Sequence, residues 1–179
     1  MSGISEISAM RELRELCELH KKVRSSGFTL IELMVVLALV AIVASFAVPS
    51  FSTIIANGRI ASSSNDVVGV LNYARAEAVK RGRIVRVSPV SGADWTSGAV
   101  AWVDENDDGA RQATEILRQT SAVPGAVTLT ATANVAFTGG GFSSTTPTLT
   151  ICDDRSGERG REVTITAGGR IRAEDITCT

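Results

Sequence analysis

The sequence predicts an α+β protein in which one long N-terminal helix, half membrane-spanning and half amphipathic, packs on antiparallel β-sheets. Three observations support this fold class. A continuous apolar segment of about 21 residues runs from Phe28 to Val48. Apolar residues then recur at helical spacing from Ser52 to Arg81. After Gly82 the chain changes to short β-branched runs separated by Gly, Pro, Ser and Asn.

The apolar Phe28–Val48 segment is long enough to cross a hydrocarbon layer of roughly 30 Å as a helix. The basic residues just before it are Lys21, Lys22 and Arg24. After Glu32, the next charged residue is Arg59. This asymmetry places the N-terminus in the cytoplasm and the chain beyond Pro49 outside. We therefore expect a single-pass membrane protein with its domain outside the cytoplasm.

Glu32 is an ionisable residue near the start of the spanning segment. Such a group is costly in hydrocarbon and is a functional hypothesis by default. One interpretation is that Glu32 reaches the headgroup layer and is only tolerated there. The other is that it pairs with a free α-amine, created by cleavage after Gly27, on a neighbouring subunit.

The hexapeptide Gly27-Phe28-Thr29-Leu30-Ile31-Glu32 resembles the class III signal of type IV pilins and type II secretion pseudopilins. The resemblance implies a leader, residues 1–27, that prepilin peptidase removes before Phe28 is N-methylated. It also implies that Glu32 pairs with the N-terminal amine of the preceding subunit when major and minor pilins assemble. The implied architecture is the type IV pilin fold, in a single-pass inner-membrane protein whose periplasmic domain later reaches the pilus and cell surface. Both Met1 and Met10 fit as the translation start.

The helix divides into an assembly segment, residues 28–51, and an amphipathic segment, residues 52–82. Pro49 lacks a backbone donor, so we expect the helix to bend there and continue. The predicted buried stripe is Val67, Val68, Leu71, Ala74 and Ala78. The predicted exposed side is Asn65, Asp66, Arg75, Glu77 and Lys80. Gly82 is expected to end the helix.

The β-rich domain covers residues 83–179. Its expected strands are Ile84–Val87, Ala99–Val103, Glu115–Gln119, Val127–Thr132, Val135–Phe137, Thr148–Cys152, Glu162–Thr166 and Arg170–Ala173. Pro89 and the Gly139-Gly140-Gly141 run are read as turns. Trp95, Gly98 and Trp102-Val103-Asp104 resemble the globular domain of the GspH/FimT branch of pseudopilins and minor pilins. That family implies a helix packed on two small antiparallel sheets.

Composition argues against most enzyme classes. The one histidine, His20, lies in the expected leader, so the mature chain lacks a residue for Ser-His or Cys-His catalysis. We expect no enzyme activity and no cofactor. Of the three cysteines, Cys17 leaves with the leader, and Cys152 and Cys178 can pair if the C-terminus is outside the cytoplasm.

An acidic segment matches the spacing of a calcium-binding loop. The matching positions are Asp104, Asn106, Asp108, Gly109 and Glu115. However, Arg111 occupies the usual apolar position, and the flanks are predicted strands. Asn and Asp are also common in turns, so we expect a solvated turn here and treat calcium as the weaker interpretation.

Five arginines lie between the two C-terminal cysteines, namely Arg155, Arg159, Arg161, Arg170 and Arg172. Arg170 and Arg172 are two residues apart, so on a strand they share one face. Two guanidinium groups side by side suit adjacent phosphates. The run Gly169-Arg170-Ile171-Arg172 resembles the GRxR signature of FimT-like minor pilins, which implies binding to double-stranded DNA during natural transformation.

The leading hypothesis is a minor pilin that binds extracellular DNA non-specifically through these arginines and supports DNA uptake. Such binding would be to backbone phosphates, and so sensitive to salt. The alternative is a structural tip-priming minor pilin, or a GspH-like pseudopilin of type II secretion, that binds only other pilins.

Overall fold

The structure, a computed structural model, describes residues 27–106 and 108–179. The expected leader therefore lies outside the described residues except for Gly27, and so do Cys17 and His20. The chain forms two compact units that meet in sequence at Val48 and Pro49.

A single helix, α2 (Leu30–Arg81), runs through both units. It continues past Pro49 as predicted. The Pro49 carbonyl accepts hydrogen bonds from the hydroxyls of Ser52 and Thr53, at 2.8 and 3.2 Å. The helix ends at Gly82, as predicted, where the backbone turns to a φ of 65° that glycine adopts without strain.

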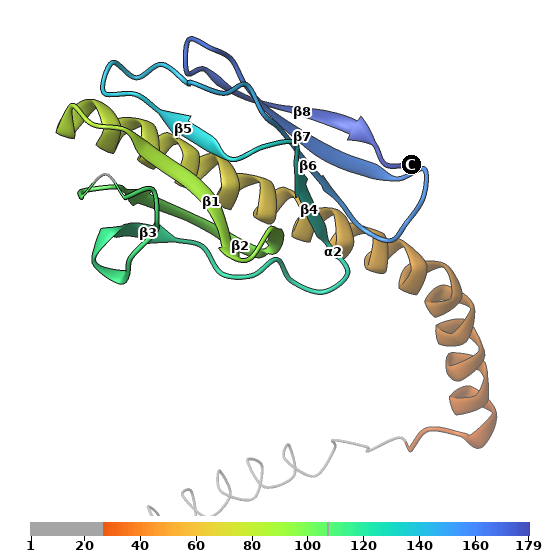
Figure 1. Cartoon of the computed structure of the whole chain (residues 1–179). Coiled ribbons are helices and arrows are strands. Elements are labelled where there is room, and N and C mark those ends of the chain that lie inside the picture. Colours follow the sequence, from red (N-terminus) through yellow and green to blue (C-terminus); the bar gives the residue numbers. More distant parts are fainter. Residues whose placement is uncertain (1–26, 107) are drawn as a thin grey trace, which may run out of the picture. The chain divides into compact units, whose positions relative to one another are not determined.

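The Pro49–Thr179 unit contains two four-stranded antiparallel sheets (Figure 1). The first has the order β3-β2-β1-β5, and the second has the order β4-β6-β7-β8. The strands are β1 (Val85–Ser91), β2 (Asp94–Val103), β3 (Ile116–Gln119), β4 (Thr128–Ala131), β5 (Val135–Phe137), β6 (Thr148–Cys152), β7 (Arg159–Ile165) and β8 (Ile171–Thr177). A 3-10 turn, η1 (Ala113–Glu115), precedes β3. All eight predicted strands are present, and the α+β architecture is confirmed.

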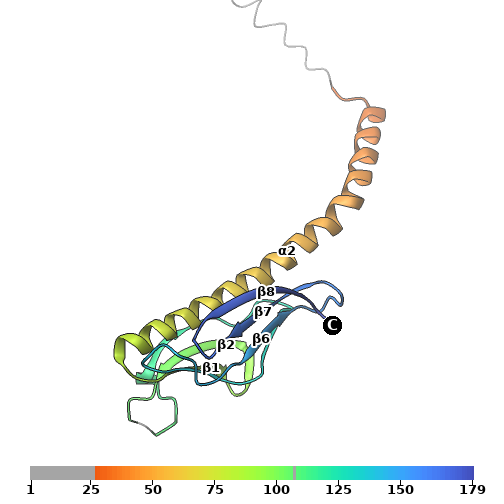
Figure 2. The same cartoon turned by 90° about the horizontal axis from the view of Figure 1, so that it is seen from above.

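The C-terminal half of α2 packs on both sheets, which lie along the same side of it (Figure 2). Val67, Leu71, Ala74 and Ala78 are buried, as the helical spacing predicted. The prediction for Glu77 was wrong. This residue falls seven positions after buried Val70 and joins the inner stripe, where its carboxylate binds Lys80 and Arg81.

Several strand boundaries also differ from expectation; β2 begins at Asp94 instead of Ala99, and β7 begins at Arg159 instead of Glu162. Pro89, read as a turn, lies within β1 next to a register shift. It is tolerated because β5 pairs only with Val85–Val87, so β1 has one neighbouring strand at Pro89. The last strand begins at Ile171, which leaves Arg170 just outside it, and it extends to Thr177.

Candidate functional site

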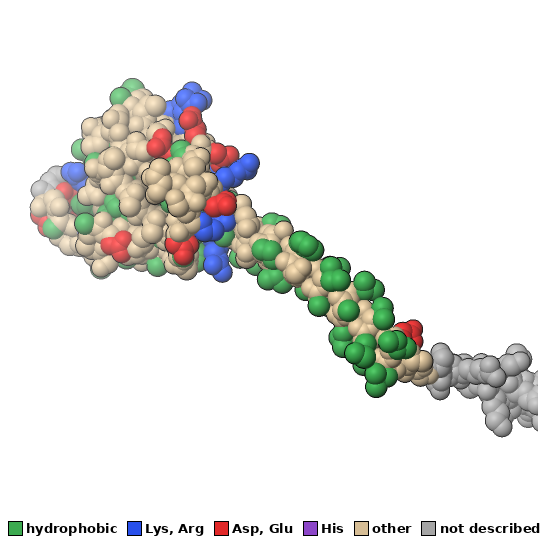
Figure 3. Space-filling model, turned by 90° about the vertical axis from the view of Figure 1, so that its right-hand side faces the viewer, with side chains coloured by type: hydrophobic (Ala, Val, Ile, Leu, Met, Phe, Trp, Pro, Cys, Tyr) green, Lys and Arg blue, Asp and Glu red, His purple; other side chains and the backbone are tan. Residues whose placement is uncertain are grey.

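The apolar segment of α2 carries the first candidate site. In the described part of the chain, α2 is the one helix long and apolar enough to span a membrane, with a mean hydropathy of 2.7 over its most apolar window. The large apolar side chains from Phe28 to Ile55 are exposed. Figure 3 shows hydrophobic groups along this part of the helix. The Glu32 carboxylate makes no ion pair within the described residues. A carboxylate in this setting is available for a partner from another molecule.

Thr29 sets where this helix begins. Its hydroxyl oxygen accepts a hydrogen bond from the Glu32 N–H at 3.2 Å, and its carbonyl accepts one from the Leu33 N–H. Thr29 thereby caps the free N–H groups of the first turn. The Thr-x-x-Glu spacing is the signal that could have predicted this cap from the sequence.

The segment with calcium-loop spacing, which was expected to form a solvated turn, is held by its own carboxylates. Asp104 accepts hydrogen bonds from the N–H groups of Asp108 and Gly109, at 3.1 and 2.9 Å. Glu115 is buried, and its two oxygens accept from the N–H groups of Glu105 and Gln112. Among residues 27–106 and 108–179, no group of three or more His, Cys, Asp or Glu side chains could hold a metal ion. The geometry is that of a closed surface turn.

Arg111, which departs from the calcium-loop pattern, has a structural role. Its guanidinium donates hydrogen bonds to the carbonyls of Pro89 and Val90, at 2.6 and 2.7 Å. The side chain therefore fastens the loop to β1.

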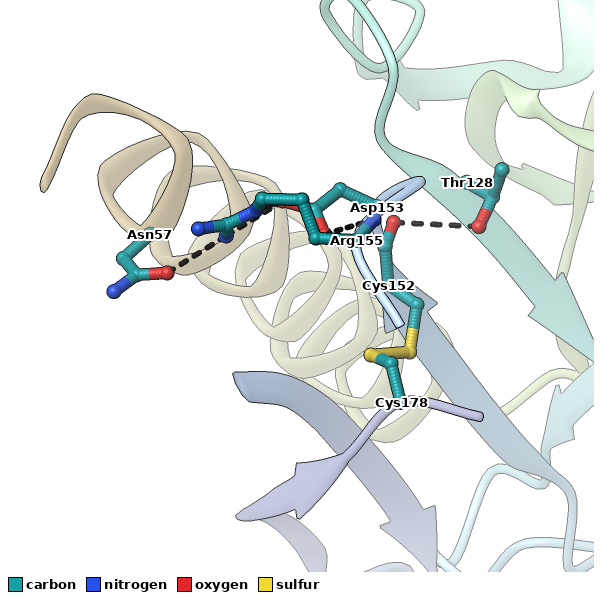
Figure 4. Close-up of a disulfide and its surroundings, with 6 residues drawn as sticks. All are labelled: Asn57, Thr128, Cys152, Asp153, Arg155 and Cys178. Atoms are coloured by element: carbon teal, nitrogen blue, oxygen red, sulfur yellow. Dashed lines mark hydrogen bonds and ion pairs between the residues drawn. A yellow bond between two sulfur atoms is a disulfide. The ribbon is translucent and has the colours of Figure 1, made fainter. Parts of the chain in front are cut away.

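Arg155 forms a clamp between α2 and the loop that joins β6 to β7 (Figure 4). Its guanidinium contacts the Asp153 carboxylate at 2.7 Å and donates to the Asn57 side-chain oxygen at 2.8 Å. Burial tends to raise the pKa of Asp153, but the hydrogen bonds and charge of Arg155 outweigh it and lower that pKa. Since the folded pKa is depressed, the clamp stabilises the fold above a pH of about 4 and is lost as the pH falls through the folded value. The guanidinium of Arg155 is thus already bound to other side chains of the domain.

Cys152 and Cys178 form the predicted disulfide, which joins residues 26 positions apart (Figure 4). The two sulfurs lie against Gly160, where any side chain would overlap Cys178 Sγ. The disulfide holds the end of β8 beside β6 and β7.

The remaining arginines occupy two regions of the β7–β8 hairpin. Arg161 pairs with Asp175 directly across the strands, at 2.8 Å, and lines a shallow cleft with Arg159 and α2 residues Asn57 and Ile60. Arg170 and Arg172 lie at the turn end of the hairpin and are exposed. Arg172 contacts Glu174 at 3.0 Å. The guanidinium groups of Arg159 and Arg170 make no ion pair with any described residue.

The turn before Arg170 is fastened to the rest of the domain by Arg75. This half-buried helix residue donates from Nε to the Gly141 carbonyl at 2.9 Å and from Nη2 to the Gly168 carbonyl at 3.2 Å. The sequence placed Arg75 on the exposed side of α2 and missed this role. No local pattern could have found it, because the carbonyls that it binds are 66 and 93 residues away.

Comparison with known families agrees with this geometry. A family model described as type II transport protein GspH matches residues 63–169, which span the amphipathic helix and most of the β domain. The chain belongs to the GspH family. A model of the prokaryotic N-terminal methylation motif matches residues 22–48 of this GspH-family protein. No curated protein gives a significant match.

Two crystal structures of the Pseudomonas aeruginosa (strain PAO1) type IV minor pilin FimU, in space groups P21 and P65, resemble this GspH-family protein. Their TM-scores are 0.58 and 0.54, with 26% and 27% identity. The matches cover 66% and 63% of this chain and 90% of the FimU chain in each case. The fold is that of a type IV pilin, with one long helix packed on antiparallel sheets.

The methylation motif and the exposed apolar helix indicate where the protein is located in the cell. This GspH-family pilin is a single-pass inner-membrane protein with a periplasmic domain, and it later enters a pilus. Its family and structural relatives are pilins, which are structural proteins that associate with other pilins.

Proposed function

We propose that this protein is a minor pilin that binds double-stranded DNA through Arg170 and Arg172 and supports DNA uptake in natural transformation. The observation that carries the proposal is the pair of exposed arginines at the turn end of the β7–β8 hairpin. In this proposal prepilin peptidase cleaves between Gly27 and Phe28, and Glu32 directs assembly into the filament.

The distribution of charge along β8 favours the turn end as the binding region. Arg170 and Arg172 come first along the chain, and the acidic residues Glu174 and Asp175 follow. Across the hairpin, Arg172 faces Thr164, whereas Glu174 faces Glu162. The turn end is therefore basic, whereas the middle of the hairpin is acidic, so a phosphate backbone is attracted to the turn.

The ion pair between Arg172 and Glu174 does not prevent phosphate binding. Both side chains are more than half exposed, at 53% and 58%. An exposed pair of this kind contributes about 0–1 kcal/mol. A DNA phosphate can therefore replace Glu174 as the partner of Arg172 at low cost.

The other arginines named in the sequence analysis contribute less to this site. Arg155 is held by Asp153 and Asn57. Arg161 is less exposed than Arg172, at 36% against 53%, and pairs with Asp175 away from the turn. Arg159 lies at the opposite end of β7, about 20 Å along the strand from the turn. We therefore restrict the proposed DNA contacts to Arg170 and Arg172, with Gly169 holding the turn.

The test is fluorescence anisotropy with a DNA duplex of about 16 base pairs and the full chain in neutral detergent at low salt. Two phosphate contacts predict a log–log salt slope of about −1.8, or about twelvefold weaker binding when salt rises fourfold. The R170A/R172A variant should bind at least about tenfold more weakly, because both contacts are lost. E174Q should bind more tightly than the parent, because it releases Arg172.

R159A is the matched control, since Arg159 is also exposed and unpaired among the described residues but lies outside the turn. It should bind duplex as the parent does. Binding by R170A/R172A at the parental level would show that the site is wrongly assigned.

A second candidate function is a structural subunit that contacts only other pilins, either in a type IV pilus or as a type II secretion pseudopilin. It is favoured by the matches to GspH and to the minor pilin FimU. In cells, R170A/R172A should reduce DNA uptake while leaving piliation normal under the first proposal. If the protein is only a structural subunit, R170A/R172A should change neither DNA uptake nor piliation. Deletion of the protein should then reduce the number of filaments or the amount of secreted protein.

A further inference from the structure

Phe142 is an exposed aromatic residue that the function described so far does not use. Its side chain is 61% exposed at the end of the Gly139-Gly140-Gly141 run. The run forms a closed turn, in which Thr138 donates to the Phe142 carbonyl and Gly141 donates to the Thr138 carbonyl, both at 2.8 Å. The ring lies against Gly140, where an added Cβ would be 3.1 Å from Phe142 Cδ2. The turn therefore holds an aromatic ring at the surface in a set position.

This aromatic turn is joined directly to the turn that carries Arg170. The Ser143 N–H donates to the Ala167 carbonyl at 3.0 Å. Arg75 donates to a carbonyl in each turn, at Gly141 and Gly168. Gly169 is in such close contact with Gly141 that a side chain on Gly169 would overlap the Gly141 carbonyl oxygen. Phe142 and Arg170 are the residues that follow these two touching glycines.

Two arginines, Arg75 and Arg170, lie at these touching turns. Arg75 binds only carbonyl groups, and Arg170 has no carboxylate partner among the residues that the structure describes. An exposed aromatic side chain and an exposed arginine on two touching turns suit a nucleic acid base and its nearby phosphate. Within a duplex, the faces of a base are covered by its neighbours, so only an unpaired base can stack on Phe142.

We propose that Phe142 and Arg170 form one composite site that binds unpaired nucleotides, so that the protein prefers single-stranded DNA or frayed duplex ends over closed duplex. The proposal rests on the proposed DNA-binding function and adds the form of DNA that is preferred. In this site Arg170 and Arg172 bind phosphates, and Phe142 stacks on the adjoining base.

The experiment compares three probes of equal length, about 12 units each, against the full chain in neutral detergent. The probes are a single strand, a blunt duplex and a single-stranded abasic phosphodiester, which keeps the charge but lacks bases. The parent should bind the single strand more tightly than the other two. F142L, which is apolar but has no aromatic face, should weaken single-strand binding at least about fivefold while leaving duplex and abasic binding within about twofold.

F142W is the matched variant that keeps an aromatic face, and it should retain the preference for the single strand. The proposal is overturned if the parent binds single strand and duplex equally, or if F142L retains the preference. It is also overturned if F142L leaves DNA binding unchanged but reduces incorporation into pili, because Phe142 would then contact a neighbouring pilin. These outcomes leave duplex binding intact, whereas failure of the proposed function would abolish binding of every probe by the parent.

Discussion

Gly169 shows why a short arginine motif has a structural part as well as a charged part. Its φ is 73°, a conformation that residues with a side chain rarely adopt. An added Cβ would also lie only 2.9 Å from Arg75 Nε and would overlap the Gly141 carbonyl. The glycine thus allows the two surface turns to touch, and the arginine that follows it depends on this contact for its position.

We predict that G169A destabilises the domain by about 2–4 kcal/mol, because it adds backbone strain to a steric overlap. The measurement is urea-induced unfolding of the full chain, followed by the fluorescence of buried Trp95 and Trp102. G168A is the matched control, because its Cβ would meet nothing closer than Thr166 Oγ1 at 3.9 Å. It should change stability by less than about 1 kcal/mol. Equal losses in the two variants would contradict this account of Gly169.

At the scale of elements, the β7–β8 hairpin is fastened at both ends by different means. At the turn end, Arg75 binds two carbonyl groups. At the open end, the Cys152–Cys178 disulfide crosses over Gly160. The two attachments are separated by the length of the strands, about 20 Å. Removing either attachment should therefore leave the opposite end of the hairpin in place.

Removing the disulfide with C152A/C178A should lower the free energy of unfolding by about 3 kcal/mol, as expected from closing a loop of this size. Duplex affinity should stay within about twofold of the parent at a temperature where the variant is folded, because the arginines lie at the other end. Urea unfolding and anisotropy on the same preparation measure both quantities. The single variant C178A should show the same loss of stability. A variant that is as stable as the parent, or that loses DNA binding while folded, would contradict this separation.

At the scale of the whole molecule, the protein combines an exposed apolar helix with a domain that has its own core. The core of the Pro49–Thr179 unit is formed by α2 residues from Ile60 onward and by both sheets. Residues 27–47, the described part of the chain before Val48, contribute no buried side chain. Their apolar surface is instead available to lipid and then to neighbouring pilins, which is the behaviour that the family requires.

We predict that E32Q reduces the amount of this protein in sheared pili by about tenfold or more, since each 1.4 kcal/mol of lost pairing changes an equilibrium tenfold. Immunoblotting of pili and of the membrane fraction measures the change. M34L, which alters a nearby exposed apolar residue without changing charge, should be incorporated as the parent is. Normal incorporation of E32Q would mean that the carboxylate is only tolerated near the headgroups.

Much of the fold could be predicted from local patterns. The spanning segment, the helix end at Gly82 and all eight strands follow from apolar runs, spacing and turn residues, because these features depend on near neighbours in the chain. The exceptions have long-range causes. Pro89 is accommodated in β1 because β5 pairs only with the first part of that strand, and Arg75 is half-buried because it binds carbonyls 66 and 93 residues away.

By itself, the sequence determined the class of protein, the attachment to a membrane, the pairing of the last two cysteines and the run that contains Arg170 and Arg172. Only the tertiary structure decided which arginines are held within the domain, since Arg155 reaches Asn57 in α2, 98 residues away, and Arg161 faces Asp175 across the β7–β8 hairpin. It also brought the turn that precedes Phe142 against the turn that precedes Arg170, through contacts between residues far apart in the chain. The physical reason is that side-chain pairing and surface composition depend on distances in space, whereas a sequence pattern records only distances along the chain.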